Sequence, residues 1–256
     1  VYGRDQFSHA MVINQLRGNT FPCEEALSPI DCVYLSFESN RVPYRYVRRC
    51  KDADFVFVPS NFEKQALIDS GADKEIIVWP HGTNTTLHRP VEKQNDDICK
   101  FLFVGRAIPR KGVDLLLFAF SKAFEAKDRV SLTIKVTEDN GYLQSILNQI
   151  PNRQNIQILS ECMTNDELAV LYKAHDVFVL PSRCEGFGLP VLDAMGCGLP
   201  VIYTDWSAMT EFAIGYAVSV SHFIPEQEES WAMGEAKGDW AEANIDDLIE
   251  TMREAY

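Results

Sequence analysis

The sequence lacks the features of a membrane-spanning, secreted or nucleic-acid-binding protein. No run of about 18 apolar residues occurs in the chain, so we expect no transmembrane helix. No basic segment followed by an apolar core opens the chain, which argues against a signal peptide. The formal net charge of −13 argues against broad nucleic-acid binding and against docking onto anionic lipid, since both need basic surface.

Cysteine and histidine show no disulfide or metal-binding pattern. The 7 cysteines are odd in number and no two are spaced as CxxC, which predicts free thiols in a reducing compartment. We therefore expect a cytoplasmic protein. The 5 histidines do not form an HExxH motif, and so we expect no metal site.

Two nucleotide-binding signatures are also absent. The runs GFGLPV and GCGLPV lack the third glycine of GxGxxG, and neither opens the first strand–helix unit. Hydride transfer with a nicotinamide is therefore disfavoured. The run GxxxxGK[ST] does not occur, which argues against a P-loop ATPase.

The sequence does contain a regular alternation of short apolar runs and amphipathic segments. The runs 54–59 and 176–180 are apolar almost throughout, as expected for strands buried on both faces of a parallel sheet. A helix is expected after Ser60, which lies three residues before Glu63 as in a capping box. Strands that alternate with helices predict right-handed crossovers and an α/β fold with parallel sheets.

The alternation also suggests domain boundaries. We expect the end of one α/β domain at 1–90, a polar linker at 91–98 and a doubly wound domain at 99–239. An amphipathic helix is expected at 240–256, packed on the interdomain side. Further strands are expected at 75–80, 101–104, 131–136, 156–159 and 201–203, and further helices at 112–125, 142–149, 164–173 and 190–196. Residues 1–50 show no clear pattern.

Two cations flank the turn that follows the strand at 101–104. Gly105 and Arg106 come directly after the strand, and Lys111 and Gly112 open the next helix. A helix N-terminus with two nearby cations suits a diphosphate. The alternative is that both are solvated loop cations, and this pair by itself does not decide between the two.

A glycine-rich turn with carboxylates follows the strand at 176–180. Gly186 and Gly188 allow a ligand to approach the backbone closely, and Glu185 could accept hydrogen bonds from sugar hydroxyls. Asp193, eight residues after Glu185, could accept hydrogen bonds from a ribose. The alternatives are a turn that only reverses the chain and a carboxylate that only interacts with the helix dipole.

Four runs of the sequence resemble retaining glycosyltransferases of family four. The first two are FLFVGRxxxxKGVDLLLxAF (101–120) and DVFVLPSRCEGFGLPVLDAMGCGLPV (176–201). Upstream, ADFVFVPSNF (53–62) and VWPHGTN (78–84) resemble the end of that family's acceptor domain. The resemblance implies the GT-B fold, with a doubly wound, Rossmann-like C-terminal domain and a partial N-terminal α/β domain.

The resemblance also implies a role for each matching residue. Arg106 and Lys111, beside Gly105, would hold the donor diphosphate and stabilise the leaving group. Glu185 matches the first carboxylate of the family's E-x7-E motif and would contact the sugar. The resemblance therefore implies Arg106, Lys111 and Glu185 as the catalytic residues. Asp193 occupies the second carboxylate position, expected at the ribose, where the family usually has glutamate.

Further residues of the implied donor site contribute mainly backbone groups. The residues expected around the phosphates and the sugar are Gly186, Phe187, Gly188 and Leu189. The residues expected at the base are Glu161, Cys162 and Met163. His81 and Gly82 lie in a loop that is expected at the cleft.

The resemblance implies a hexosyltransferase-type enzyme. It would transfer a sugar from a nucleoside-diphosphate sugar to a glycan, lipid or protein hydroxyl, with retention of configuration and without a metal or other cofactor. Since about 50 residues cannot supply the usual first sheet, we expect the chain to be cut or reduced, and membrane contact could involve sequence that precedes it. A GT-B epimerase or phosphorylase and a non-catalytic nucleotide-sugar-binding module are the alternatives.

Overall fold

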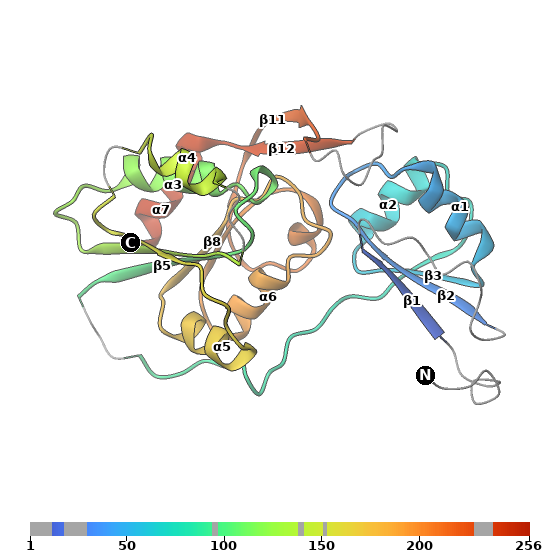
Figure 1. Cartoon of the computed structure of the whole chain (residues 1–256), viewed down its shortest axis with the longest axis horizontal. Helices are drawn as coiled ribbons and strands as arrows, with labels where there is room; N and C mark the ends of the chain where they lie inside the picture. Colours follow the sequence, from blue (N-terminus) through green and yellow to red (C-terminus); the bar gives the residue numbers. More distant parts are fainter. Residues whose placement is uncertain (1–11, 18–29, 94–96, 138–140, 151–152, 228–237) are drawn as a thin grey trace. The chain divides into compact units, whose positions relative to one another are not determined.

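The computed structural model describes residues 12–17, 30–93, 97–137, 141–150, 153–227 and 238–256 (Figure 1). The chain forms two compact units. The first comprises Val1–His81, Glu185–Phe187 and Ile224–Trp240, and the second comprises Gly82–Cys184, Gly188–Phe223 and Ala241–Tyr256. This division differs from the expected boundaries, since residues 82–90 belong to the second unit and residues 185–187 and 224–239 to the first.

The first unit is built on a four-stranded parallel sheet in the order β1–β2–β3–β4. Its elements are β1 (Val12–Arg17), β2 (Asp31–Ser36), α1 (Tyr44–Asp52), β3 (Phe55–Val58), α2 (Asn61–Asp69) and β4 (Ile76–Val78). Helices α1 and α2 lie on the same side of this sheet (Figure 1). The expected strand at 54–59 and the helix after Ser60 are thus confirmed, whereas β1, β2 and α1 were not predicted.

Glu63 connects helix α2 to the end of strand β2. The Ser60 side chain caps α2 by accepting a hydrogen bond from the Glu63 backbone N–H at 3.2 Å. The Glu63 carboxylate, which is fully buried, accepts hydrogen bonds from the Phe37 N–H at 3.0 Å and from Ser36 Oγ at 3.2 Å. A buried carboxylate needs such partners, and here they fix the loop that follows β2.

The second unit is built on a six-stranded parallel sheet in the order β10–β9–β8–β5–β6–β7. The strands are β5 (Cys99–Val104), β6 (Val130–Lys135), β7 (Ile156–Leu159), β8 (Val177–Leu180), β9 (Val201–Thr204) and β10 (Gly215–Val218). Strand β8 is buried along its whole length, and Phe101, Leu102 and Phe103 of β5 are 0% exposed. The apolar run 176–180 therefore forms a strand covered on both faces, whereas in β3, within the run 54–59, Phe55 is 45% exposed.

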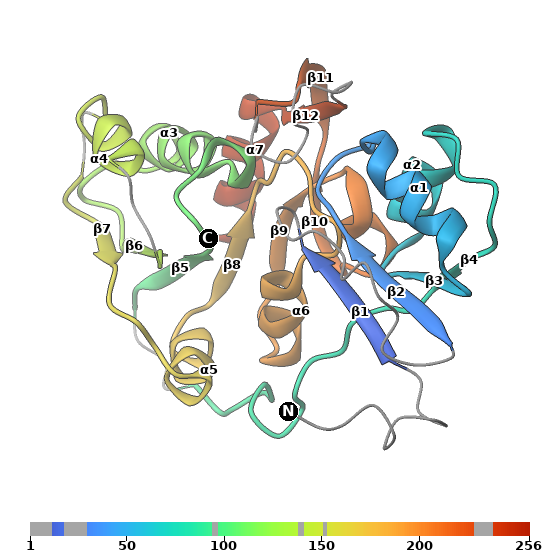
Figure 2. The same cartoon turned by 45° about the vertical axis from the view of Figure 1, so that its right-hand side comes forward.

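Five helices cover the two faces of this sheet. They are α3 (Val113–Ala123), α4 (Tyr142–Leu147), α5 (Asn165–Lys173), α6 (Leu189–Gly196) and α7 (Ile245–Ala255). Helices α3, α4 and α7 lie on one face, and α5 and α6 on the other (Figure 1 and Figure 2). The second unit is therefore a doubly wound α/β domain. No helix among the described residues is long and apolar enough to cross a bilayer.

The C-terminal segment differs from its prediction in two respects. Residues 239–243 form strand β12 (Asp239–Ala243), paired with β11 (Val220–Pro225), so the helix begins only at Ile245. Asn244 caps this helix by accepting hydrogen bonds from the N–H groups of Asp246 and Asp247. Helix α7 packs on α3 within the second unit, where Arg253 Nε donates to the Ala123 carbonyl at 3.2 Å.

Candidate functional site

The strand order of the second unit reverses between β5 and β8. From β5 the chain continues outward through β6 and β7, and from β8 it continues outward on the other side through β9 and β10. The two central strands pair in parallel, with Phe101 beside Val177. In such sheets ligands bind beyond the carboxyl ends of the strands at this reversal. The loops after β5 and β8 are therefore the expected position of a ligand-binding site.

The loop after β5 turns tightly and packs against the loop after β8. A short 3-10 helix (Pro109–Lys111) precedes Gly112, which has φ of +67°. A Cβ added at Gly112 would lie 2.0 Å from the Pro181 carbonyl oxygen, so only glycine fits here. The Arg183 N–H donates to the Arg110 carbonyl at 2.7 Å and joins the two loops.

The predicted cations lie on this loop in different environments. Arg106 is exposed, whereas Lys111 is 9% exposed. A Cβ added at Gly105 would lie 3.7 Å from Lys111 Cδ, so the lysine stem runs beside Gly105. The structure therefore brings Gly105 and Lys111 together beyond the carboxyl end of β5.

A buried arginine that the sequence analysis did not select supports the loop after β8. Arg183 Nε donates to Glu242 Oε2 at 2.6 Å, and its Nη2 donates to Asp114 Oδ2 at 2.7 Å. Burial disfavours the charged guanidinium, but hydrogen bonds to Asp114 and Glu242 and their charges raise the Arg183 pKa above its usual value. This network holds the loops after β5 and β8 together and is structural.

Helix α6 begins one residue earlier than predicted, at Leu189 and not at Pro190. Gly188, with φ of +102°, is its N-cap, so Leu189 is the first helical residue and Pro190 the second. A Cβ added at Gly188 would lie 3.0 Å from Met209 Cγ. The positive φ and this close contact explain the glycine without a ligand.

Asp193 is held by two residues from the segment that opens the second unit. Thr83 Oγ1 donates to Asp193 Oδ1 at 2.5 Å, and His88 Nδ1 lies 3.1 Å from the same oxygen. Thr83 Oγ1 also lies 2.7 Å from His88 Nδ1. Because the single Thr83 hydroxyl proton goes to Asp193, the histidine must donate from Nδ1. The Asp193 carboxylate is therefore oriented by the protein itself.

Further contacts fix the position of this Thr83–His88–Asp193 cluster. His88 is 8% exposed, and its ring meets Tyr172 edge-on with centroids 5.9 Å apart. A Cβ added at Gly196 of α6 would lie 3.1 Å from His88 Cβ. Burial, followed by the negative charge of Asp193, raises the Tyr172 pKa well above its usual value. Thr83 and His88 were not predicted as site residues, although Thr83 directly follows the predicted pair His81 and Gly82.

Gly186 and Phe187 belong to the first unit by their contacts. A Cβ added at Gly186 would lie 2.0 Å from Glu63 Oε1, and Ser60 Oγ donates to the Gly186 carbonyl at 2.8 Å. The close approach that this glycine permits is therefore to Glu63. Phe187 meets the His81 ring edge-on, with centroids 5.2 Å apart.

His81 also contacts Tyr34 of strand β2. Tyr34 Oη donates to the Trp79 carbonyl at 3.0 Å and lies 3.4 Å from His81 Nε2. Burial, and less strongly the charge of Glu63, raises the Tyr34 pKa to about 12. The first unit therefore brings His81 and Phe187 together, whereas Gly82 is exposed and belongs to the second unit.

The remaining predicted residues differ in exposure. Glu185 is 4% exposed and belongs by contacts to the first unit. In the second unit Glu161 and Cys162 are exposed and Met163 is half-buried, in the segment after β7. This segment at the carboxyl end of β7 is therefore largely exposed.

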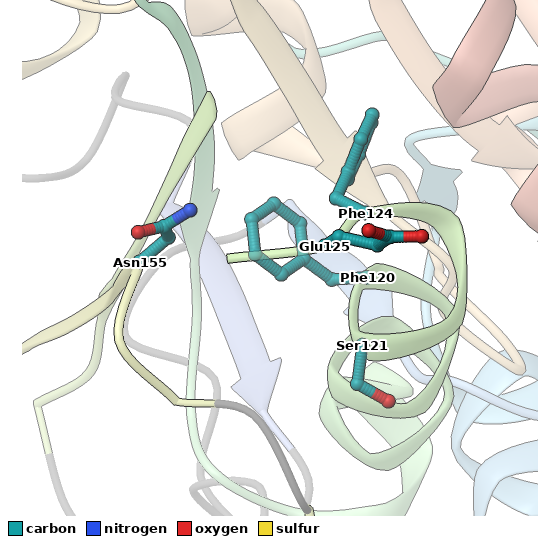
Figure 3. A pocket seen from close by; sticks show the side chains of 5 residues that line it. All are labelled: Phe120, Ser121, Phe124, Glu125 and Asn155. Carbon is teal, nitrogen blue, oxygen red and sulfur yellow. The ribbon is translucent and has the colours of Figure 1, made fainter. Parts of the chain in front are cut away.

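The small surface pocket in Figure 3 lies at the opposite end of the sheet. Phe120, Ser121, Phe124, Glu125 and Asn155 line it. These residues lie near the end of α3 and just before β7, at the amino ends of the strands. It is therefore remote from the loops described above. The described residues include no group of three or more His, Cys, Asp or Glu side chains arranged to hold a metal ion.

Comparison with known proteins agrees with the arrangement of the second unit. The family model "Glycosyl transferases group 1" matches residues 84–234, more than half of the chain. An uncharacterized glycosyltransferase from Methanocaldococcus jannaschii is 32% identical over 148 residues, which are 57% of this chain and 37% of that protein.

Solved structures show the same fold. Sucrose-phosphate synthase from Thermosynechococcus elongatus has a TM-score of 0.66 at 21% identity, covering 82% of this chain and 51% of that one. TarM from S. aureus has a TM-score of 0.68 at 14% identity, covering 91% and 44%. This chain thus spans about half or less of each of these three proteins. The family match and the two parallel α/β units show that the chain belongs to the glycosyl transferases group 1 family and has the GT-B fold.

Proposed function

We propose that this chain binds a nucleoside-diphosphate sugar as the donor of a retaining hexosyltransferase that uses no metal. The observation that supports this most is the reversal point of the second sheet. There Gly105, Arg106 and Lys111 follow β5, and the N-terminus of α6 follows β8. The family match covers this whole region.

Each residue has a distinct part in the proposed reaction. Negative charge develops on the diphosphate as it leaves, and the cations Arg106 and Lys111 would stabilise that charge in place of a metal. Arg106 is exposed, and the Lys111 stem runs beside Gly105. Glu185 would accept hydrogen bonds from sugar hydroxyls.

Asp193 is proposed to bind the ribose through one carboxylate oxygen. The interactions found for it among the described residues use Oδ1, and this leaves Oδ2 for a ribose hydroxyl. The family usually has the longer glutamate at this position. Thr83 and His88 would compensate by holding the shorter side chain in one orientation.

The backbone around Gly188 and Leu189 would meet the phosphates or the sugar. In the first turn of α6 the N–H groups of Val191 and Leu192 donate to the Gly188 carbonyl and Pro190 has no N–H. The N–H groups proposed to meet negative charge are therefore those of Gly188 and Leu189. Gly186 and Phe187 complete the proposed donor residues, and the backbone of Glu161, Cys162 and Met163 would contact the base. His81 and Gly82 are proposed as cleft residues, and the acceptor is proposed to be a hydroxyl of a glycan, lipid or protein.

Calorimetric titration with nucleoside diphosphates and nucleotide sugars tests the proposed donor site. We expect selective binding of one base, and a loss of affinity of about 10- to 100-fold in Arg106→Ala and in Lys111→Ala, since each removes a charge-assisted hydrogen bond. Lys122→Ala, at an exposed position of α3, is the charge-matched control. Equal affinity in all three variants would contradict the proposal.

Product analysis separates transfer from the alternative activities. A transferase releases nucleoside diphosphate only when an acceptor is present, whereas an epimerase alters the sugar without one and a phosphorylase requires inorganic phosphate. NMR of the product identifies its anomeric configuration and so tests retention. Donor binding without turnover on any acceptor would favour a non-catalytic binding module.

A further inference from the structure

A lysine is buried at the carboxyl end of strand β6. Lys135 is the last residue of β6 and is 3% exposed. Its ammonium donates a hydrogen bond to the Val136 carbonyl at 2.9 Å. In the sequence it is the one charged residue of the stretch SLTIKV, a signal that did not enter the prediction of the site.

The ammonium of Lys135 has no counter-charge among the described residues. No carboxylate of this part of the chain lies within 4.0 Å of it. By contrast, the buried guanidinium of Arg183 pairs with both Asp114 and Glu242. An ammonium has three N–H donors, of which one carbonyl satisfies a single one. A buried charge left in this state is costly, so the position favours an anionic ligand.

Lys135 lies between two strand ends that the proposed donor site uses. In the parallel sheet it is in register with Val104 of β5 and with Leu159 of β7. The Gly105 N–H donates to the Lys135 carbonyl at 3.0 Å, and the Val136 N–H donates to the Leu159 carbonyl at 2.9 Å. Strand β5 therefore leads directly into Gly105 and the cations, and strand β7 leads into the segment proposed for the base.

We infer that Lys135 is a third cation for the donor, whose ammonium binds a phosphate oxygen of the nucleoside diphosphate. This inference rests on the proposed function and adds a residue to it. The diphosphate carries the anionic charge that the buried ammonium needs, whereas the base and the ribose are neutral. Lys135 therefore contributes to affinity for the diphosphate and not for the nucleoside.

Calorimetry on Lys135→Met tests the inference, with the tightest-binding nucleoside diphosphate, its nucleoside and inorganic pyrophosphate as ligands. We expect affinity for the diphosphate and for pyrophosphate to fall about 10- to 100-fold, as for loss of one charge-assisted hydrogen bond. Affinity for the nucleoside should not change. Lys122→Met makes the same substitution at an exposed position and should leave all three affinities unchanged.

Unfolding of the ligand-free protein separates binding from a structural role. Removing an uncompensated buried charge should leave the urea midpoint of Lys135→Met unchanged or raise it, while Lys135→Arg should retain diphosphate binding. If Lys135→Met does not fold, Lys135→Gln provides the same comparison. If both neutral variants fold and both have a lowered urea midpoint, the inference is overturned.

The binding data also distinguish failure of this inference from failure of the proposed function. Unchanged diphosphate affinity in the neutral variants, or an equal loss for the nucleoside, overturns the inference alone. If the unsubstituted chain binds none of the nucleoside diphosphates, the proposed function fails, and the role of Lys135 fails with it.

Discussion

Thr83 Oγ1 donates a hydrogen bond of 2.5 Å to Asp193 Oδ1, across 110 residues of sequence. The contact joins the segment that opens the second unit to helix α6. It gives the Asp193 side chain a fixed orientation before any ligand arrives. A carboxylate oriented in advance loses less entropy on binding than a mobile one, which would favour the ribose contact proposed for it.

Thr83→Val should weaken both the second unit and its affinity for nucleotide. The substitution keeps the shape but removes the hydroxyl, so we expect a loss of about 1–2 kcal/mol in the free energy of unfolding. Urea denaturation and nucleoside-diphosphate titration measure the two effects. Thr85→Val, at an exposed position two residues later, is the control. A double-mutant cycle with Asp193→Asn should show coupling, and additive effects would contradict direct contact.

Gly112→Ala should destabilise the second unit much more than Gly141→Ala. Both glycines have positive φ, +67° and +89°, so both substitutions incur a backbone cost of about 1–2 kcal/mol. Of the two, only Gly112 would place the added methyl against a carbonyl oxygen, that of Pro181 at 2.0 Å. At Gly141 no atom of the described residues, its chain neighbours aside, lies within 4 Å of the added Cβ. Chemical denaturation of the two variants compares them directly. Equal losses would show that the Gly112–Pro181 packing is absent.

Arg183→Met should be strongly destabilising, by about 3–5 kcal/mol, because it leaves the carboxylates of Asp114 and Glu242 without their common partner. Arg129→Met removes an arginine from an exposed ion pair with Asp97 and should have a much smaller effect. The free energy of unfolding in urea measures both. Similar losses in the two variants would mean that burial does not strengthen the Arg183 network.

The free energy of unfolding should depend on pH through His175. Burial lowers the pKa of this histidine, with smaller opposing effects from the Leu171 carbonyl and Asp176 and a small lowering from Lys100 and Lys93. Below pH about 6.5 the unfolded chain binds a proton that the folded protein does not. The contribution of His175 to stability is therefore fully present above that pH and is lost as the pH decreases. The slope for one proton is at most about 1.4 kcal/mol per pH unit.

Urea denaturation at pH 5.5 and 7.5 measures this contribution of His175. The neutral ring accepts from Thr133 Oγ1 at 2.8 Å and lies 2.7 Å from the Leu171 carbonyl. In His175→Gln the difference in the free energy of unfolding between pH 5.5 and pH 7.5 should be smaller than in the unsubstituted protein. It should persist in His222→Gln, which changes an exposed histidine. An unchanged difference in His175→Gln would assign the pH dependence to other groups.

Much of the second unit could be predicted from local sequence. Its strands are short apolar runs, and Thr164 and Glu167 form a capping box in which each side chain bonds the other residue's backbone. Such signals involve residues at most a few positions apart, so no knowledge of the rest of the chain is needed. The two carboxylates Glu185 and Asp193, eight residues apart, and the cations after β5 could be located in the same way, and their roles are proposals.

Other features depended on tertiary structure because they join distant segments. Strand β1 became evident only through its pairing with β2. The apolar run 32–37 covers most of β2, but it was not assigned to a strand until the structure showed its pairing with β1 and β3. Residues 185–187, adjacent to the second unit in sequence, belong to the first unit through contacts of Gly186 with Ser60 and Glu63.

The sequence by itself thus determined the alternation of strands and helices, the parallel α/β class and the family resemblance, because periodicity and motif spacing are local properties. Only the tertiary structure decided that Thr83 and His88 hold Asp193 and that Lys135 is buried with no carboxylate partner among the residues that the structure describes. The partner of a polar side chain is chosen by packing between segments far apart in the chain. Burial and charge pairing, which control how a site binds, follow from that packing.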